Sequence, residues 1–275
     1  MTRVVGVHGI GNYAYYRRAG SAEKATAEIS RDWMSWLRTG LPAGTSIDLT
    51  VAYYAHYLHR GTPQGAFDDP AALEPAAQQM LITWVEQRQP HPQMALGPQT
   101  IRARQAADWL TRRFGRAARL AAVAFCREAH AYLANPGSPR RKAAREGVAA
   151  AITTHQPQVV IAHSLGSVVV YETLWAHPEI SVAMLVTLGS PLGMRHAVFD
   201  RLQPAPDNGR GARPPGVASW TNLADVGDIV AVPRDLPGRF DGITRHVPDL
   251  TIGDWDFHSI RNYLACPATV EVLLS

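Results

Sequence analysis

Cysteine and lysine are both scarce in this sequence, and each scarcity limits what the chain can do. Its 275 residues include two cysteines, Cys126 and Cys266. Neither belongs to a CxxC pair, so neither a zinc site nor a dithiol redox motif is indicated. A disulfide between them stays open, although buried free thiols in a reducing compartment are the simpler interpretation. Of the 27 basic residues only Lys24 and Lys142 are lysine, a bias typical of a GC-rich genome.

Long apolar runs and a strong charge imbalance are also missing. No stretch reaches the roughly 18 apolar residues of a membrane span. Residues 1–11 lack the long apolar region and the cleavage site of a signal peptide, so the expected location is the cytoplasm. The net charge of +4 is too small for this length to predict a nucleic-acid partner. No cofactor and no oligomeric state is indicated.

The first 55 residues predict a strand, a helix and a second strand. Arg3–His8 is a short valine-rich run that ends at a glycine-containing loop, as a buried strand does. Ser21–Leu37 repeats apolar residues at helical spacing, and Ser21 can cap that helix. Ser46–Tyr54 is the second strand. Such a βαβ unit predicts a parallel sheet.

Residues 56–135 interrupt this alternation. They are rich in alanine and arginine and carry few strand signals, so we expect two helices, over Ala71–Gln89 and Gln99–Ala134. A helical stretch of this length between two sheet strands suggests an inserted cap, with residues 1–55 and 136–275 forming the core. His56 and His59 lie three residues apart, but no further metal ligands converge near them.

The alternation of strands and helices returns after residue 136. The expected elements are helices over Ser138–His155, Leu165–Ala176, His258–Leu264 and Ala268–Leu274, and strands over Gln158–His163, Val182–Leu188, Ala218–Leu223 and Arg245–Ile252. Gln203–Gly216 is crowded with proline, glycine and arginine and is expected to form a mobile surface loop. The fold class is therefore α/β, with a mostly parallel central sheet flanked by helices.

The segment around Ser164 carries the strongest chemical signal. A valine-rich strand is followed by small-x-Ser-x-Gly and then by an apolar helix. A serine on so sharp a turn needs strained backbone angles, so its flanking residues must be small, as Ala162 and Gly166 are. The turn lifts the serine oxygen clear of the sheet towards the mouth of the site and leaves the Leu165 N–H, at the start of a helix, free to bind an oxyanion. The competing interpretation is that Ser164 only caps a helix.

The sequence Ala162-His163-Ser164-Leu165-Gly166 resembles the nucleophile elbow of the α/β-hydrolase superfamily. Its (G/A)HSLG pattern is similar to that of lipase-like and serine-esterase-like members. The resemblance covers most of the chain outside residues 56–135. It implies the α/β-hydrolase fold with a helical cap insertion. Alanine stands at position 162, where glycine is commoner, but it is also small.

A glycine-containing loop after the first strand supplies a second oxyanion N–H in that superfamily. The matching loop here is His8–Asn12, so the resemblance implies Ile10 as the donor and Gly11 as the second choice. Glycine neighbours let the backbone approach a substrate oxygen. A phosphate-binding loop is the alternative, but the GxGxxG spacing is absent. His163 and Pro191, the latter in a turn after the next strand, are further candidates for the pocket.

The superfamily places an acid and then a histidine after the serine. Residues 228–233 (DIVAVP) resemble the acid loop of lipase-like hydrolases, which favours Asp228 over Asp225. Asp225 would then have a structural role, such as capping the loop. The histidines downstream are His246 and His258. His246 would lie along a strand, whereas His258 precedes a short helix with a tyrosine, as the family's last histidine does.

The predicted function is that of a serine hydrolase with Ser164, Asp228 and His258 as its triad. Ser164 would attack the carbonyl of a small-molecule or lipid-like carboxylic ester, and water would release the acyl-enzyme. Amide hydrolysis, thioester hydrolysis and cyclisation use the same triad and stay open, as does a non-catalytic binding module. The arginines of Gln99–Ala134 are expected to form a solvated helix face; contact with a membrane surface is the less favoured alternative.

Overall fold

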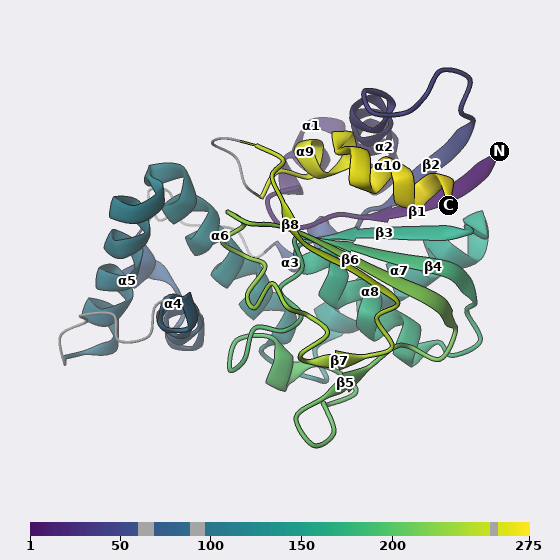
Figure 1. Ribbon diagram of the computed structural model, residues 1–275. Helices are drawn as coiled ribbons and strands as arrows, with labels where there is room; N and C mark the ends of the chain where they lie inside the picture. The colour runs from purple at the N-terminus through teal and green to yellow at the C-terminus, as the bar shows by residue number, and fades with distance from the viewer. Residues whose placement is uncertain (60–68, 89–96, 254–257) are drawn as a thin grey trace.

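The computed structural model describes residues 1–59, 69–88, 97–253 and 258–275 and centres on a six-stranded sheet (Figure 1). Its strand order is β2-β1-β3-β4-β6-β8, and every recorded pairing is parallel. The strands are β1 (Thr2–Val7), β2 (Ile47–Ala52), β3 (Val159–His163), β4 (Val182–Leu188), β6 (Val217–Asp225) and β8 (Arg245–Leu250). The predicted α/β class with a parallel central sheet is confirmed.

Helices cover both faces of this sheet (Figure 1). The helices α2 (Ala22–Arg38), α9 (Ile260–Ala265) and α10 (Pro267–Leu274) lie on one face, and α7 (Pro139–His155) and α8 (Leu165–Ala176) lie on the other. Successive side chains of a strand point to opposite faces. In β1, Val4 therefore packs in the cluster that includes α2, and Val5 packs in the cluster that includes α8. Both faces of the sheet are buried, as its valine-rich strands predict.

Helix α2 follows the sequence pattern closely. The Ser21 side chain caps it by accepting a hydrogen bond of 3.3 Å from the Lys24 N–H. The residues at helical spacing are all buried: Ala25, Ile29, Trp33 and Leu37. A Cβ atom at Gly6 would lie 2.6 Å from the Trp33 ring. Glycine in β1 is what lets this helix lie so close to the sheet.

Three helices beside the sheet form most of the predicted insertion: α4 (Pro75–Arg88), α5 (Gln99–Phe114) and α6 (Arg116–Leu133) (Figure 1). The prediction of a single helix over Gln99–Ala134 is wrong, because two helices occupy this segment. Gly115 separates α5 from α6 with φ 87° and ψ 173°, a backbone conformation that side-chain-bearing residues avoid. Gln89, the predicted end of the preceding helix, lies outside the described residues.

The insertion shares its core with the sheet. Trp84 of α4 and Phe125 of α6 have ring centroids 5.3 Å apart, and both belong to the hydrophobic cluster that contains Val5 and Val7 of β1. The cluster is continuous from the helices of the insertion to one face of the sheet. The boundaries at residues 56 and 135 stay a prediction.

Several short elements were not predicted. They are α1 (Tyr13–Ala19), α3 (Ala55–Leu58), the 3-10 helices η1 (Pro70–Ala72) and η2 (Phe199–Arg201), and the paired strands β5 (Gly211–Ala212) and β7 (Phe240–Asp241). Strand β5 lies inside the segment Gln203–Gly216, for which the sequence predicts a mobile surface loop. There the Arg210 guanidinium donates hydrogen bonds to both carboxylate oxygens of Asp241.

The two cysteines are both buried and free, so no disulfide joins Cys126 to Cys266. Burial raises the pKa of the Cys126 thiol. Among the described residues, no helix combines the length and the apolar character needed to cross a membrane. Within the same residues, no group of three or more histidine, cysteine, aspartate and glutamate side chains is placed to hold a metal ion.

Candidate active site

Ser164 lies on a sharp turn between β3 and α8. Its φ of 54° and ψ of −129° are strained for a residue with a side chain, and the residue is fully buried. The turn is packed against the end of β1, because a Cβ atom at Gly166 would collide with the carbonyl oxygens of Val7 and His8. Glycine is therefore required at position 166, and the tight turn directs the serine side chain away from the sheet.

The side chains of Ser164, His258 and Asp228 form a chain of hydrogen bonds. His258 Nε2 lies 2.8 Å from Ser164 Oγ, and His258 Nδ1 lies 2.9 Å from each carboxylate oxygen of Asp228. An ionised carboxylate only accepts hydrogen bonds, so Nδ1 carries the proton and Nε2 is left to accept one from the serine hydroxyl. The structure brings these three residues together, although the chain places them far apart in sequence.

The Asp228 carboxylate is fully buried and well supplied with donors. Its Oδ1 accepts the N–H groups of Val230 and Ala231 at 2.8 and 3.2 Å, and its Oδ2 accepts the Tyr263 hydroxyl at 2.7 Å. Burial raises the pKa of Asp228, but the charge of His258 and these hydrogen bonds outweigh it, and the pKa lies below its ordinary value. Asp228 is therefore ionised at neutral pH.

His163 holds His258 in place, and Gly189 lets the chain pass close to Asp228 and His258. His163 Nε2 donates a 3.0 Å hydrogen bond to the His258 carbonyl oxygen. Burial, followed by the nearby His258, moves the pKa of His163 well below its ordinary value, so this ring is neutral. Gly189 has φ 55°, and a Cβ atom there would lie 2.5 Å from Asp228 Oδ2. Pro191 is buried two residues further on, where its carbonyl accepts the N–H of Met194.

The loop after β1 lies against Ser164. A Cβ atom at Gly9 would lie 2.7 Å from Ser164 Cβ. The Gly9 carbonyl oxygen accepts hydrogen bonds from His8 Nδ1 at 2.7 Å and from Asn12 Nδ2 at 3.0 Å. In a trans peptide the C=O and the following N–H point in opposite directions, so the Ile10 N–H points away from Asn12. The hydrogen bonds to the Gly9 carbonyl therefore fix the direction of the Ile10 N–H.

The N–H of Gly11, the second-choice oxyanion donor, already has a hydrogen-bond acceptor. Its N–H donates a 2.9 Å hydrogen bond to Glu128 Oε1, on α6. Of the two loop residues, Ile10 therefore remains the candidate donor. Leu165 is the first residue of α8, where an N–H has no acceptor within the helix. Ile10 and Leu165 thus stay the candidate oxyanion donors.

His8 has a structural part in this loop. Its Nε2 accepts the Tyr54 N–H at 3.1 Å, while its Nδ1 donates to the Gly9 carbonyl. Burial lowers the pKa of His8 to about 4, so the ring is neutral at pH 7. Both ring nitrogens are used, and His8 is not available as a base.

The two alternative triad residues lie in other networks. Asp225 Oδ1 accepts the Gly227 N–H at 2.6 Å, and Asp225 Oδ2 accepts the Ile252 N–H at 2.8 Å. These bonds hold the loop that carries Asp228. His246 lies on β8, where its Nδ1 is 3.2 Å from the Asn222 amide nitrogen. Neither side chain is recorded in contact with Ser164.

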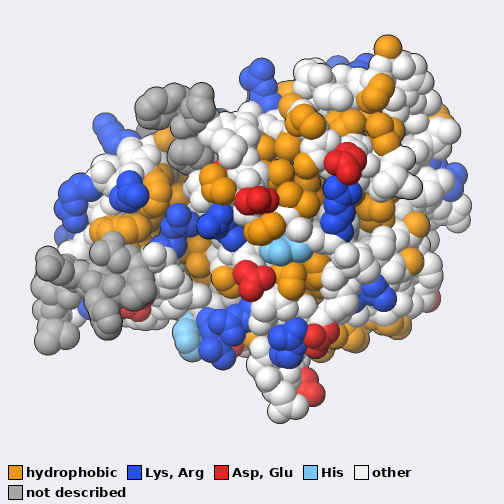
Figure 2. Space-filling view, viewed as in Figure 1, with side chains coloured by type: hydrophobic (Ala, Val, Ile, Leu, Met, Phe, Trp, Pro, Cys, Tyr) orange, Lys and Arg blue, Asp and Glu red, His pale blue; other side chains and the backbone are white. Residues whose placement is uncertain are grey.

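No pattern in the sequence indicates that the insertion contacts this site. Trp84 Nε1 donates a 2.7 Å hydrogen bond to the Ile229 carbonyl, and Arg88 Nη1 donates a 3.0 Å bond to the Asp228 carbonyl. Both residues lie on α4. Figure 2 shows several basic side chains on the side of the molecule where α4–α6 lie in Figure 1. The acid loop is therefore held by two donors from the insertion.

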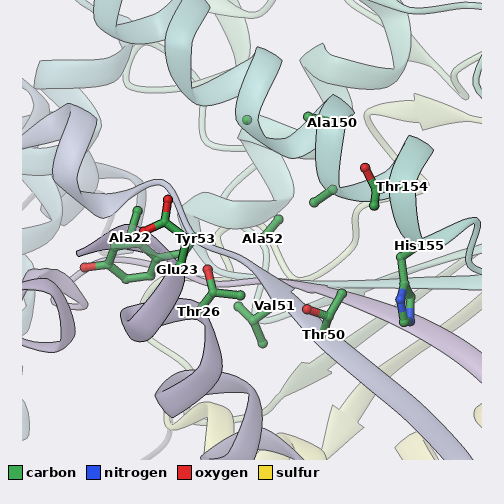
Figure 3. A pocket seen from close by; sticks show the side chains of 12 residues that line it. Ala22, Glu23, Thr26, Thr50, Val51, Ala52, Tyr53, Ala150, Thr154 and His155 are labelled. Atoms are coloured by element: carbon green, nitrogen blue, oxygen red, sulfur yellow. The ribbon is translucent and has the colours of Figure 1, made fainter. Parts of the chain in front are cut away.

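A separate hollow of about 670 Å³ lies along the edge strand β2, between α2 and α7 (Figure 3). Its lining residues are Ala22, Glu23 and Thr26, then Thr50, Val51, Ala52 and Tyr53, and finally Gly147, Ala150, Ala151, Thr154 and His155. None of them belongs to the hydrogen-bonded chain around Ser164.

Comparison of the chain with protein-family models, with curated proteins and with solved structures finds no match in any of the three.

Proposed function

We propose that this protein is a serine hydrolase with the α/β-hydrolase fold, and that it cleaves a carboxylic ester through an acyl-enzyme on Ser164. The observation that carries the proposal is the continuous chain of hydrogen bonds from Ser164 through His258 to Asp228. A serine, a histidine and a buried carboxylate in this arrangement form the nucleophile, base and orienting group that acyl transfer requires.

The position of the site in the sheet also supports the proposal. In the sheet, β1 and β3 are neighbours, with β2 on the outer side of β1 and β4 on the outer side of β3. The chain therefore leaves β1 and β3 in opposite directions, and the position between these two strands is a switch point. In open parallel sheets, ligands bind beyond the carboxyl ends of the strands at such a switch point. Ser164 follows β3 there, and the loop of Ile10 follows β1.

In the acylation step, Ser164 Oγ bonds to the ester carbonyl carbon as His258 Nε2 takes the serine proton. The carbonyl electron pair moves onto the oxygen, and the N–H groups of Ile10 and Leu165 stabilise that oxyanion. When the intermediate collapses, the bond from carbon to the leaving oxygen breaks. His258 returns the proton to that oxygen, so that an alcohol leaves and Ser164 carries the acyl group.

In the deacylation step, a water molecule takes the place of the serine. His258 accepts a proton from the water as its oxygen attacks the acyl carbon. The intermediate then releases Ser164, which recovers its proton from His258, and the carboxylic acid departs. Asp228 stays ionised throughout and stabilises the imidazolium that forms in each step.

The test combines an active-site probe with a panel of substrates. The folded protein is incubated with a fluorescent fluorophosphonate, and the labelled peptide is identified by mass spectrometry. We expect labelling at Ser164 that is lost in Ser164→Ala. Ser219→Ala is the matched control, because Ser219 lies near the start of β6 and its hydroxyl donates to the Ala183 carbonyl of β4. Absence of labelling in the folded wild type would overturn the proposal.

The substrate panel decides the reaction class. Aryl esters of increasing acyl length are compared with the thioester and the anilide of the same acids. We expect kcat/KM to be highest for the esters. Faster turnover of the thioesters or anilides would keep Ser164 as the nucleophile but reject ester hydrolysis as the function.

A further inference from the structure

Glu128 contacts the loop beside Ser164 without belonging to the proposed triad. It lies on α6 of the insertion, and its Oε1 accepts the Gly11 N–H at 2.9 Å. Desolvation raises the pKa of Glu128 to about 7, although the Gly11 hydrogen bond and Arg127 act in the opposite direction. Such ionisable groups are concentrated at functional sites. A contact between the insertion and the candidate oxyanion loop therefore needs an explanation.

The Ile10–Gly11 peptide is held from both sides. Asn12 Nδ2 donates a 3.0 Å hydrogen bond to the Ile10 carbonyl, and Glu128 accepts the Gly11 N–H. Gly11 has φ 78°, and a Cβ atom built there would meet nothing within 4 Å. Glycine moves readily between backbone conformations. Ile10 packs against the hydrophobic core, so on the Gly11 side it is hydrogen bonds that fix this peptide.

We propose that Glu128 is a positioning residue: its carboxylate holds the Ile10–Gly11 peptide so that the neighbouring Ile10 N–H stays directed at the reacting carbonyl oxygen. The inference rests on the proposed hydrolase function. Preorganised donors stabilise an oxyanion because they need no rearrangement during the reaction. Loss of the Glu128 contact frees the peptide to rotate, and the donor then loses its fixed direction.

The charged and titratable groups that face Glu128 do not change their protonation near neutral pH, so the ionisation of Glu128 itself is the main change there. They are Arg127 on the same helix, and Tyr53 and Tyr54 after β2. Burial raises the pKa of both tyrosines, that of Tyr53 to about 12, so these two side chains stay neutral. An ionised carboxylate is a stronger acceptor than a protonated one. The loop is therefore held more firmly above pH 7 than below it.

Three substitutions of Glu128 distinguish the effect of its hydrogen bond to Gly11 from the effect of its negative charge. Glu128→Gln keeps an acceptor oxygen at the same reach, Glu128→Asp keeps the charge but is too short to reach Gly11, and Glu128→Ala loses both. At pH 8 we expect the Asp and Ala variants to lose at least about tenfold in kcat with KM changed less than about twofold, as for a lost oxyanion contact. The Gln variant should stay closer to the wild type. Asp108→Ala, which removes an exposed carboxylate on α5, is the control.

The pH profile adds a readout that a purely structural role would not move. The ratio of wild-type to Glu128→Gln kcat/KM cancels any pH dependence that the two proteins share. We expect this ratio to rise with pH through a midpoint near 7, the pKa of Glu128. The corresponding ratio for Asp108→Ala should stay flat.

The outcomes separate this inference from the proposed function. Asp and Ala variants with wild-type kcat, or a flat ratio for Glu128→Gln, would overturn the inference while the wild type still reacts with the fluorophosphonate. A wild type that neither reacts with the probe nor hydrolyses esters would overturn the proposed function, and the inference with it. Thermal unfolding of each variant shows whether it is folded; if Glu128→Ala is not, the Asp and Gln variants decide.

Discussion

The Tyr263 hydroxyl donates a 2.7 Å hydrogen bond to Asp228 Oδ2. The same hydroxyl oxygen accepts the Asp225 N–H at 2.9 Å, so its single proton is directed to Asp228. Tyr263 is fully buried on α9, close in sequence to His258. The Asp225 N–H, at the end of β6, thus orients the Tyr263 hydroxyl, and that hydroxyl orients the Asp228 carboxylate.

Replacing Tyr263 by phenylalanine tests this relationship. The ring keeps its packing, but Asp228 loses one donor and the Asp225 N–H loses its acceptor. We expect kcat/KM to fall about tenfold, equivalent to about 1.4 kcal/mol of transition-state stabilisation. Steady-state kinetics on an activated ester measure the effect. Unchanged kinetics in the folded variant would show that the other donors suffice to orient Asp228.

The two aspartates of the acid loop should respond differently to amidation. Asp228→Asn can present an N–H to His258, which disfavours the required tautomer, and we expect kcat to fall by about four orders of magnitude. In Asp225→Asn one of two backbone N–H groups loses its acceptor, so we expect a loss of about 1–3 kcal/mol in the free energy of unfolding. Activity of the folded Asp225 variant should change far less. The reverse order of activities would make Asp225 the triad acid.

Two glycines in helices offer a matched pair of substitutions to alanine. In Gly166→Ala the new methyl group meets the backbone carbonyls of Val7 and His8, which are held in β1 and its loop. We expect loss of activity and destabilisation of several kcal/mol. In Gly147→Ala, on α7, the nearest atom is Tyr57 Cε2 at an ordinary 3.5 Å. Higher helix propensity should then stabilise the protein by up to about 1 kcal/mol, as thermal and urea unfolding can measure.

Acid should destabilise the fold through His8. Its pKa is about 4 in the folded protein, against an ordinary value of 6.5. Between these values the unfolded chain binds a proton that the folded protein does not, so stability is lost as the pH falls, at up to about 1.4 kcal/mol per pH unit. The difference in the free energy of unfolding between the wild type and His8→Gln should therefore become smaller as the pH falls from 6.5 towards 4. His196→Gln, at an exposed position, is the control; a constant gap for His8→Gln would contradict the assignment.

The sequence was most informative where local pattern and packing agree. Helix α2 and its four buried residues follow directly from apolar spacing and a capping serine. The turn at Ser164 is equally local, because its strand, its small flanking residues and its helix are contiguous in the chain. The proximity of Asp228 and His258 to Ser164 agrees with the order that the resemblance implied, while their catalytic roles stay predictions.

The contacts between distant segments could not be predicted in the same way. The break at Gly115 depends on how α5 and α6 pack, because a lone glycine is also compatible with a continuous helix. Glu128 and Arg88 lie in alanine- and arginine-rich helices whose local sequence resembles any solvated helix. Their partners, Gly11 and Asp228, are 117 and 140 residues away in the chain. Only the docked position of the insertion shows their relation to the site.

The insertion holds a loop on each side of the nucleophile, through Glu128 on one and through Trp84 and Arg88 on the other. It follows that this segment is not an exchangeable module. A chimera that received a different helical segment in this place would have to restore three specific hydrogen bonds and a continuous apolar core before the loops around Ser164 regained their shape. Single substitutions on the solvent-facing side of α4–α6 would leave these contacts intact, whereas transplanting the segment would remove them.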